Sequence, residues 1–398
     1  MGVIKSGPLT GVKILDLSRV LAGPFATQRL ADLGADVIKV ERPGTGDETR
    51  QWGPPWQADG STSSYFTSVN RGKRSIALDM GSAEGLEIVR ALAAESDVVI
   101  HNLRTDSAQK MGLAFVDLRS ANPDLILCRI TGFGDSREPQ ARPGYDLVVQ
   151  AESGLMALTG PVDGEPQKVG VAVVDVLTGL EASTAILAAL VGRGSGQGGC
   201  DIEVPLLDAA MASLVNVAQG ALATGTRPPR WGNAHASIVP YQPFKASDGH
   251  VVVAVTNDPQ WRSLCDVLGD LELTGDQRFA TNPDRVVHRE QLVPLLRELF
   301  KTRTASGWVS SLSAAGIPCG VVMTVDEAFA AAAEAGSPLT VDLAEGTQVV
   351  APPQRFDGQR QFSTVEPPRL GQHTDEVLAE IGFEAERIAQ LREQGVVG

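Results

Sequence analysis

The sequence has few cysteines, few histidines and a shortage of positive charge. Its four cysteines (Cys128, Cys200, Cys265 and Cys319) are scattered without a CxxC pair, a usage typical of a reducing cytoplasm that argues against a disulfide framework or a zinc site. The five histidines show no metal-ligand spacing, so we predict no metal. The formal net charge of −14 disfavours nucleic acid and anionic membranes as partners, although a local basic cluster could still bind an anionic ligand.

Long apolar runs are also lacking. No stretch of about 18 or more apolar residues occurs, so we predict no membrane span. The N-terminus goes directly into a strand-like pattern without an apolar signal region, and we therefore expect a cytoplasmic protein. With 398 residues, 43% of them hydrophobic, the chain is too long for one ordinary core, which indicates two domains.

Short β-branched runs alternate with helical patterns through the first part of the chain. Residues 12–17 and 36–41 are typical of strands and flank a helical pattern at residues 25–33, which Gly34 ends. A strand–helix–strand unit of this length implies parallel strands. The alternation continues with strands at residues 75–79, 97–101 and 125–130 and a helix at residues 84–94. We predict an α/β fold with a doubly wound, Rossmann-like sheet.

The later part of the chain predicts a second, smaller domain. Composition loosens at residues 221–230, ALATGTRPPR, which is typical of a linker. We predict a large Rossmann-like domain at residues 1–220, a small α+β domain at residues 231–325, and a return segment at residues 326–398. That segment completes the large domain and ends in short helices within residues 374–394.

The stretch from residue 168 to residue 179 carries a candidate nucleophile. Its sequence is KVGVAVVDVLTG, in which residues 169–174 predict a buried strand and the Ala- and Leu-rich residues 180–191 predict a helix. Asp175 would lie at the junction, where an ionised carboxylate beside a crevice can act as a nucleophile. The alternative is that Asp175 only caps the helix. A formal GxGxxG match at Gly194, Gly196 and Gly199 follows a helix instead of a strand, so we interpret it as an exposed turn.

Six stretches, in order along nearly the whole chain, resemble the family III CoA-transferases, the relatives of formyl-CoA transferase and carnitine CoA-transferase. They are LDLSRVLAGPFATQRLADLGADVIKVERPGTGDETR at residues 15–50, NRGKRSIALDM at 70–80, GYDLVVQAESGLMALTG at 144–160, VGVAVVDVLTG around Asp175, GNAHASIVPYQPF at 232–244 and LGQHTDEVLAEIG at 370–382. A match of this extent is far more specific than any single motif.

The resemblance implies that CoA moves from an acyl-CoA thioester to a free carboxylic acid. Asp175 matches the family's nucleophile, which forms a mixed anhydride with the acyl group and then an aspartyl-CoA thioester. Asp146 matches an acidic residue close to it, whose charge raises the pKa of the nucleophile or orients it. Acyl exchange of this kind needs no metal, redox group or tightly bound cofactor, and CoA is a substrate. By analogy, the backbone near Gly232 and Asn233 supplies oxyanion donors.

The resemblance also implies a CoA site in the large domain. The positions that it matches to the nucleotide, pantetheine and phosphates are Val20, Ala22, Arg42, Leu78, Asn102, Leu103, Lys110 and Met111. Leu21 stands where the formyl-CoA branch has a Gln that touches the acyl group, which argues against a formyl or oxalyl pocket. His235 either contacts substrate or is an ordinary loop residue.

Three alternatives remain from the sequence. Related α-methylacyl-CoA racemases carry a His where this chain has Tyr145, and a phenol replaces imidazole poorly in acid–base work. A catalytically silent CoA-binding protein would have no need of Asp175. A nucleotide-dependent oxidoreductase would need a glycine fingerprint after the first strand, where Gly23 is followed by Pro24.

The stretch at residues 232–244 resembles the branch that handles dicarboxylates, such as succinate with glutarate or hydroxymethylglutarate. A dicarboxylate needs a cation for its distal carboxylate, for which Arg142, Arg230 and Lys245 are candidates. The family also implies a homodimer in which two rings interlock, so the partners that we expect are acyl-CoA, a carboxylic acid and a second copy of the chain.

Overall fold

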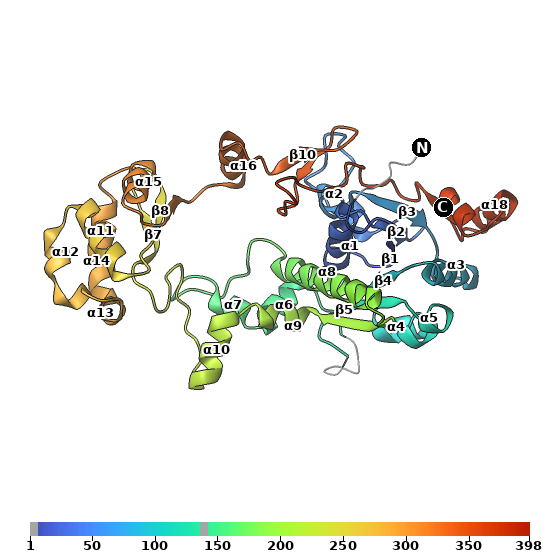
Figure 1. The fold of residues 1–398 in the computed structure, drawn as a ribbon, viewed down its shortest axis with the longest axis horizontal. Coiled ribbons are helices and arrows are strands. Elements are labelled where there is room, and N and C mark those ends of the chain that lie inside the picture. Colours follow the sequence, from blue (N-terminus) through green and yellow to red (C-terminus); the bar gives the residue numbers. More distant parts are fainter. Residues whose placement is uncertain (1–6, 136–141) are drawn as a thin grey trace. The chain divides into compact units, whose positions relative to one another are not determined.

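The structure is a computed structural model that describes residues 7–135 and 142–398, and its chain folds into two compact units (Figure 1). Unit 1 comprises Met1–Leu155, Val169–Gln219 and Ser337–Gly398, and unit 2 comprises Met156–Lys168 and Gly220–Gly336. Unit 2 thus includes residues 156–168, which the sequence analysis assigns to the large domain, and residues 326–336, which it assigns to the return segment. The N-terminal six residues, part of the stretch considered for a signal region, lie outside the described ranges.

A six-stranded parallel sheet forms the centre of unit 1. Its spatial order is β3-β2-β1-β4-β5-β6, and every neighbouring pair runs parallel. The strand order reverses between β1 and β4, which makes the carboxyl ends of these two strands the topological switch point of the sheet. The strands are β1 (Lys13–Asp16), β2 (Asp36–Glu41), β3 (Lys73–Ala77), β4 (Val98–His101), β5 (Ile126–Thr131) and β6 (Asp201–Pro205). The predicted parallel α/β sheet is confirmed.

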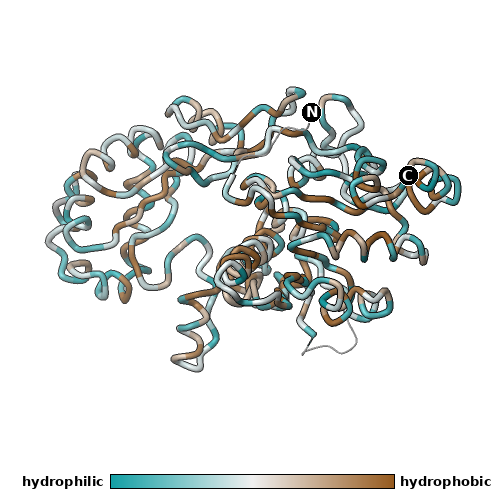
Figure 2. The backbone as a smooth tube through the Cα atoms, turned by 45° about the vertical axis from the view of Figure 1, so that its right-hand side comes forward, coloured by the Kyte–Doolittle hydropathy of each residue, from teal (hydrophilic) through white to brown (hydrophobic). Residues whose placement is uncertain are grey.

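Helices cover both faces of this sheet because its strands are apolar on both sides. Ile14, Val98 and Ile126 pack with helices α1 and α8 on one face, while Leu15 and Val99 pack with α3, α5, α17 and α18 on the other. Hydrophobic stretches run through the middle of the unit in Figure 2. The helices of unit 1 are α1 (Ala22–Asp32), α2 (Ser64–Asn70), α3 (Ala83–Ala94), α4 (Thr105–Lys110), α5 (Phe115–Ala121), α6 (Asp146–Glu152), α8 (Val173–Gly194), α9 (Leu206–Ala212), α17 (Thr374–Glu380) and α18 (Ala385–Glu393), with a 3₁₀ turn η1 (Glu48–Gln51) and a small hairpin, β10 (Thr340–Asp342) and β11 (Gln348–Val350).

Helix α8 corrects the sequence analysis in two respects. The strand predicted at residues 169–174 does not form, because α8 begins at Val173 and buries Val174 with helical spacing. Tertiary context therefore overrides the β propensity of this run. Asp175 is not the cap of the helix either, since Ala172 holds the N-cap position. The helix ends at Gly194, and the exposed glycine turn predicted after it is confirmed.

Among residues 7–135 and 142–398, α8 is the single helix that is long and apolar enough to cross a membrane. The bent pair formed by α9 and α10 (Val215–Thr224) meets the same criterion only jointly. In the structure one face of α8 packs into the core of unit 1, where Val174, Ala182 and Ile186 are buried against α1 and the sheet.

Unit 2 has its own core around a three-stranded antiparallel sheet, β7-β8-β9. Phe244, Trp261 and Trp308 are buried in this core. Its elements are β7 (Tyr241–Lys245), β8 (His250–Ala254), α11 (Asp258–Leu268), α12 (Leu271–Gly275), η2 (Gln277–Phe279), α13 (Asn282–Val287), α14 (Arg289–Phe300), α15 (Ala305–Ala314), β9 (Cys319–Val321) and α16 (Val325–Glu334). Helices α7 (Leu155–Leu158) and α10 (Val215–Thr224) cross from one unit to the other in sequence, so the first residues of the predicted 221–230 linker are helical.

Candidate active site

Two clefts open at the switch point of the parallel sheet. The first, here called the Asp175 cleft, has a volume of about 330 Å³ and is lined by the loops that follow β1, β4 and β5 together with Asp175. The second, here called the Arg42 cleft, has a volume of about 780 Å³ and is lined by the loops that follow β1, β2, β3 and β4. The clefts share five lining residues, Arg19, Glu48, Asn102, Leu103 and Arg104. They therefore adjoin, and together they suit a long ligand.

Asp175 enters its cleft from the first turn of α8. One turn further along this helix, Gly179 permits close packing of α8 on the start of α1. A Cβ atom at Gly179 would lie 2.7 Å from the carbonyl oxygen of Ala22 and 3.0 Å from the ring of Phe25. Since side chains four residues apart share one helix face, Asp175 and Gly179 both face the start of α1. This four-residue spacing thus fixes Asp175 beside the loop that precedes Ala22.

Asp146, the first residue of α6, caps the helix that carries Asp175. Its Oδ1 accepts the backbone N–H groups of Val174 at 2.8 Å and of Asp175 at 3.2 Å, and its Oδ2 accepts the Gln150 amide at 2.6 Å. A carboxylate in this place satisfies free N–H groups of the first turn. Asp146 and Asp175 therefore lie close together, as the resemblance implies. Asp146 caps the helix that carries Asp175, and its negative charge also raises the pKa of Asp175.

The Asp175 carboxyl group is partly buried and has an unusual acidity. Burial, and after it the negative charge of Asp146, raises the pKa of Asp175 to about 7, although a helix N-terminus favours the ionised form. The field of these carboxylates also reaches Tyr65 in α2, where burial, then Asp175, Asp146 and Asp47, raise the pKa of the phenol to about 12. At neutral pH the Asp175 cleft thus holds a carboxyl group that gains and loses its proton readily, while the phenol of Tyr65, which lines neither cleft, stays neutral. Tyr65 was not singled out from the sequence.

Most residues that the sequence analysis assigned to CoA line these two clefts. Val20 and Ala22 line the Asp175 cleft, Arg42, Leu78 and Met111 line the Arg42 cleft, and Asn102 and Leu103 line both. The tentative substrate residues Leu21 and Tyr145 also line the Asp175 cleft. Lys110 differs, because it lies exposed at the end of α4 and lines neither cleft. Its assignment to CoA stays a prediction.

Asn102 has a structural task that the sequence did not suggest. Its Oδ1 accepts the backbone N–H of Arg19 at 3.0 Å, and its Nδ2 donates to the carbonyl of Arg19 at 2.8 Å. Both ends of the amide are therefore engaged by the loop after β1, and Asn102 holds that loop against the end of β4.

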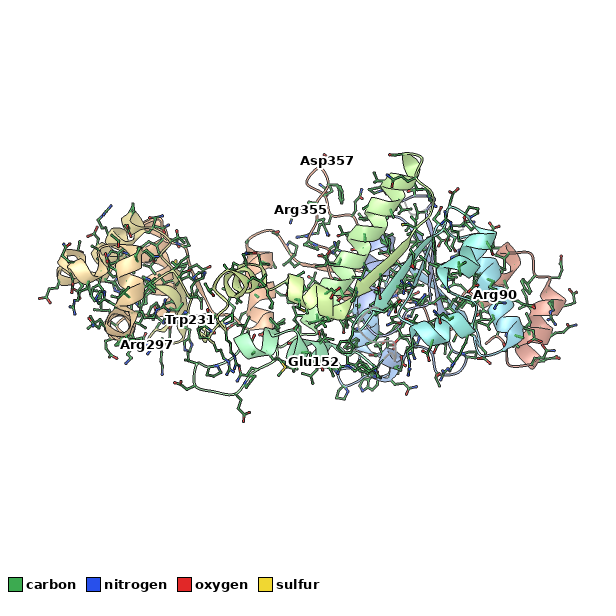
Figure 3. All side chains as sticks on the ribbon, turned by 90° about the horizontal axis from the view of Figure 1, so that it is seen from below. Arg90, Glu152, Trp231, Arg297, Arg355 and Asp357 are labelled. Carbon is green, nitrogen blue, oxygen red and sulfur yellow. The ribbon has the colours of Figure 1, made fainter. Side chains whose placement is uncertain are left out.

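Three arginines supply positive charge to the Asp175 cleft: Arg19, Arg104 and Arg142. Only Arg142 was named from the sequence, as one of three candidates for a distal carboxylate. Its guanidinium stacks on Phe133 at 3.9 Å and pairs with Glu152 of α6, which is labelled in Figure 3. Arg19 and Arg104 lie in loops that follow strand ends. Their position after a predicted parallel strand is the feature of the sequence that could have indicated a role in ligand binding.

Gly232, Asn233 and His235 belong to unit 2, where they line a separate pocket of about 970 Å³. Trp231 and Arg297, both labelled in Figure 3, line it too. Arg230 also lies there and donates to the carbonyls of Ala157, Pro161 and Gly164. Lys245, at the end of β7, lines none of the three pockets. The substrate roles of Gly232, Asn233 and His235 stay predictions.

The chemistry that these clefts offer is acyl transfer at a carboxylate. A partly buried Asp at a helix start can attack a thioester carbonyl, and the arginines among the acidic and basic side chains of the adjoining clefts can bind the anionic groups of a long substrate. Among residues 7–135 and 142–398, no group of three or more His, Cys, Asp or Glu side chains is placed to hold a metal ion. Fold and site therefore define a parallel α/β protein with a partly buried carboxyl group at the switch point of its sheet, an arrangement suited to acyl transfer.

Comparison with known proteins gives the family. Residues 9–374 match the model of CoA-transferase family III, and the chain belongs to this family. It is 41% identical to human succinyl-CoA:glutarate CoA-transferase over 98% of this chain and 90% of that protein. It is 42% identical to succinate–glutarate CoA-transferase of Agrobacterium fabrum over 94% of this chain and 96% of that protein. A crystal structure of a CaiB/BaiF family protein from Brucella suis superposes with a TM-score of 0.85 at 42% identity, covering 94% of this chain and 99% of that one. The protein is thus a CoA-transferase that uses CoA thioesters as substrates.

Proposed function

We propose that this enzyme moves CoA from succinyl-CoA to a second dicarboxylic acid of similar length, such as glutarate, with Asp175 as the nucleophile. The observation that carries the proposal is the carboxyl group of Asp175 at the start of α8, partly buried in a cleft with three arginines. The dicarboxylate class is supported by the human and Agrobacterium relatives, which are named for succinate and glutarate.

The reaction proceeds by acyl exchange at Asp175. A carboxylate oxygen attacks the thioester carbonyl, the C–S bond breaks, and a mixed anhydride and CoA thiolate form. The thiolate then attacks the aspartyl carbonyl and releases succinate, which leaves an aspartyl-CoA thioester. The acceptor carboxylate attacks this thioester, and the released thiolate attacks the acceptor acyl carbon, which yields the new acyl-CoA and the free Asp175 carboxylate. Gly232, Asn233 and His235 are our candidates for contacts to the acyl group or oxyanion, and Tyr145 lines the cleft beside Asp175.

Arg142 is our candidate for the cation that binds the distal carboxylate. Of the three candidates from the sequence, it is the one that lines the cleft with Asp175. Its pair with Glu152 has side chains 43% and 40% exposed, and exposed ion pairs contribute little stability. A substrate carboxylate can therefore take the place of Glu152 on the planar guanidinium, where a bidentate contact is favourable.

The proposal is tested by comparing glutarate with pentanoate, which has the same length but no distal carboxylate. With succinyl-CoA as donor, we expect glutaryl-CoA as the favoured product in liquid chromatography–mass spectrometry. Arg142→Gln should lower kcat/KM for glutarate roughly 10- to 100-fold, as for a lost hydrogen bond to a charged group, and leave pentanoate nearly unaffected. Lys245→Gln is the matched control. Equal losses for both acids, or a loss on Lys245→Gln instead, would contradict the role of Arg142.

We also propose that the enzyme is a cytoplasmic homodimer. The free cysteines fit a reducing compartment. Exposed apolar side chains on α8 and α9 of unit 1, among them Val191 and Met211, would be covered by a second copy of the chain. Light scattering after size-exclusion chromatography should give twice the chain mass, and a monomer at micromolar concentration would contradict the proposal.

A further inference from the structure

Val20 has a backbone conformation that a β-branched residue rarely adopts. Its φ is +72°, in the left-handed region where a Cβ branch is crowded. Val20 lies between β1 and α1, at the switch point of the sheet, and lines the Asp175 cleft. Residues in such conformations persist only where their surroundings hold them.

A fully buried ion pair holds this loop. The backbone N–H of Val20 donates to both carboxylate oxygens of Asp47, at 3.3 and 3.2 Å. Asp47 in turn pairs with Lys39 at 2.9 Å, and both side chains are 0% exposed. The ammonium of Lys39 also donates to the carbonyl of Ser18 at 2.8 Å. The pair thus holds the loop at two points, on either side of Arg19.

A second buried pair secures the start of the same loop. Asp16 and Lys73 lie 3.1 Å apart with 0% exposure, and Asp16 accepts the backbone N–H of Ser18 at 2.9 Å and its hydroxyl. Thr49 supports the first pair, since its N–H and hydroxyl donate to Asp47 at 3.0 and 2.8 Å. Buried ion pairs contribute little net stability compared with apolar residues of the same volume. Because both pairs bind the same loop, their role is to position that loop and not to stabilise the fold.

We propose that the Lys39–Asp47 pair is a positioning device for acyl-CoA: it holds Val20 in the left-handed conformation and so fixes the loop from Ser18 to Ala22 beside Asp175. The inference rests on the proposed function in one respect, namely that the acyl-CoA thioester passes this loop. Lys39 and Asp47 act through the backbone of Val20 and need no contact with the reacting atoms.

A double-mutant cycle between Asp47→Asn and Val20→Gly tests this. Glycine adopts positive φ without steric cost, so the loop of Val20→Gly no longer depends on Asp47 for its conformation. Whatever Val20→Gly does by itself, the cycle compares the effect of Asp47→Asn in the two backgrounds. We expect Asp47→Asn to raise the KM for acyl-CoA and the Kd for CoA about tenfold in the wild-type background and less than about threefold in the Val20→Gly background. The acceptor KM should change less than about twofold.

Two further variants keep the test decisive. Lys39→Met/Asp47→Asn leaves no unpaired buried charge and replaces Asp47→Asn in the cycle if that variant does not fold. Asp32→Asn is the matched control, since Asp32 is buried and paired with Arg71 at 2.6 Å, away from the loop. It should lower the melting temperature without changing the KM for acyl-CoA.

Equal increases of KM in both backgrounds would overturn the inference while leaving the proposed function intact. Assays of the wild-type enzyme distinguish a failure of this inference from a failure of the proposed function. If the wild-type enzyme neither binds nor transfers CoA, the proposed function itself is wrong.

Discussion

Replacing Asp175 by Asn should stabilise the free protein, and only at neutral or alkaline pH. Burial and Asp146 raise the pKa of Asp175 to about 7 from an ordinary value of 3.8. The folded chain therefore holds this proton more tightly than the unfolded chain. Between these two values the folded state binds more protons, so the free energy of unfolding falls as the pH rises. The cost of ionised Asp175 is absent below about pH 4 and fully present above about pH 7.

The size of the effect follows from the two pKa values. Their difference corresponds to about 4 kcal/mol, which is an upper bound because Asp175 is partly exposed to solvent in the cleft and screened. We expect Asp175→Asn to raise the free energy of unfolding by about 2 kcal/mol at pH 8.5. For a unit of this size the melting temperature should rise by roughly 4 °C. At pH 4 the two proteins should agree within about 0.5 kcal/mol.

Differential scanning calorimetry of the ligand-free wild-type and Asp175→Asn proteins between pH 4 and pH 8.5 measures this difference in stability. Glu181→Gln is the matched control, since Glu181 is exposed on the same helix. A stability difference between wild type and Asp175→Asn that stays constant over this range would refute the reasoning, as would a less stable Asp175→Asn at pH 8.5. Either result would mean that ionisation of the Asp175 carboxyl group does not destabilise the folded state.

Three further predictions concern activity. Because the nucleophile must be ionised, kcat/KM for acyl-CoA should rise about tenfold per pH unit below pH 7 and level off above it; a flat profile from pH 5 to 8 would contradict this. Asp146→Asn keeps an acceptor for the helix end but removes the charge, so the midpoint of that profile should move to lower pH, and an unchanged midpoint would show that burial alone sets it. Gly179→Ala should lower kcat at least about tenfold, because its Cβ meets the Ala22 carbonyl at 2.7 Å. Gly194→Ala on the same helix meets nothing within 4 Å and should retain full activity; equal losses in both would contradict the packing argument.

The parallel sheet could be predicted from the sequence because its signals are local. Asp36–Glu41 forms a strand at the predicted residues, and apolar residues on both faces of each strand are typical of a buried parallel sheet. The residues after β1 and β4 could be assigned to CoA only through the family resemblance; the structure brings these loops together because the ends of parallel strands meet at one edge of a sheet.

The start of α8 could not be predicted because its cause is distant in sequence. The run before Asp175 has a strand composition, and the helix begins at Val173 because Asp146 supplies acceptors from another element. Likewise, nothing local marks Asp47 as the partner of the Val20 backbone, 27 residues away. Contacts of this kind depend on the assembled tertiary structure.

The proposed mechanism requires Asp175 to carry the acyl group and then CoA covalently during transfer. The most direct test mixes the enzyme with succinyl-CoA, traps it with hydroxylamine or borohydride, and maps the modified peptide by mass spectrometry. We predict a modification at Asp175 that is absent in Asp175→Asn. No adduct with any of several acyl-CoA donors, together with deuterium uptake from heavy water at the α-carbon of a 2-methylacyl-CoA, would contradict it and support the racemase alternative.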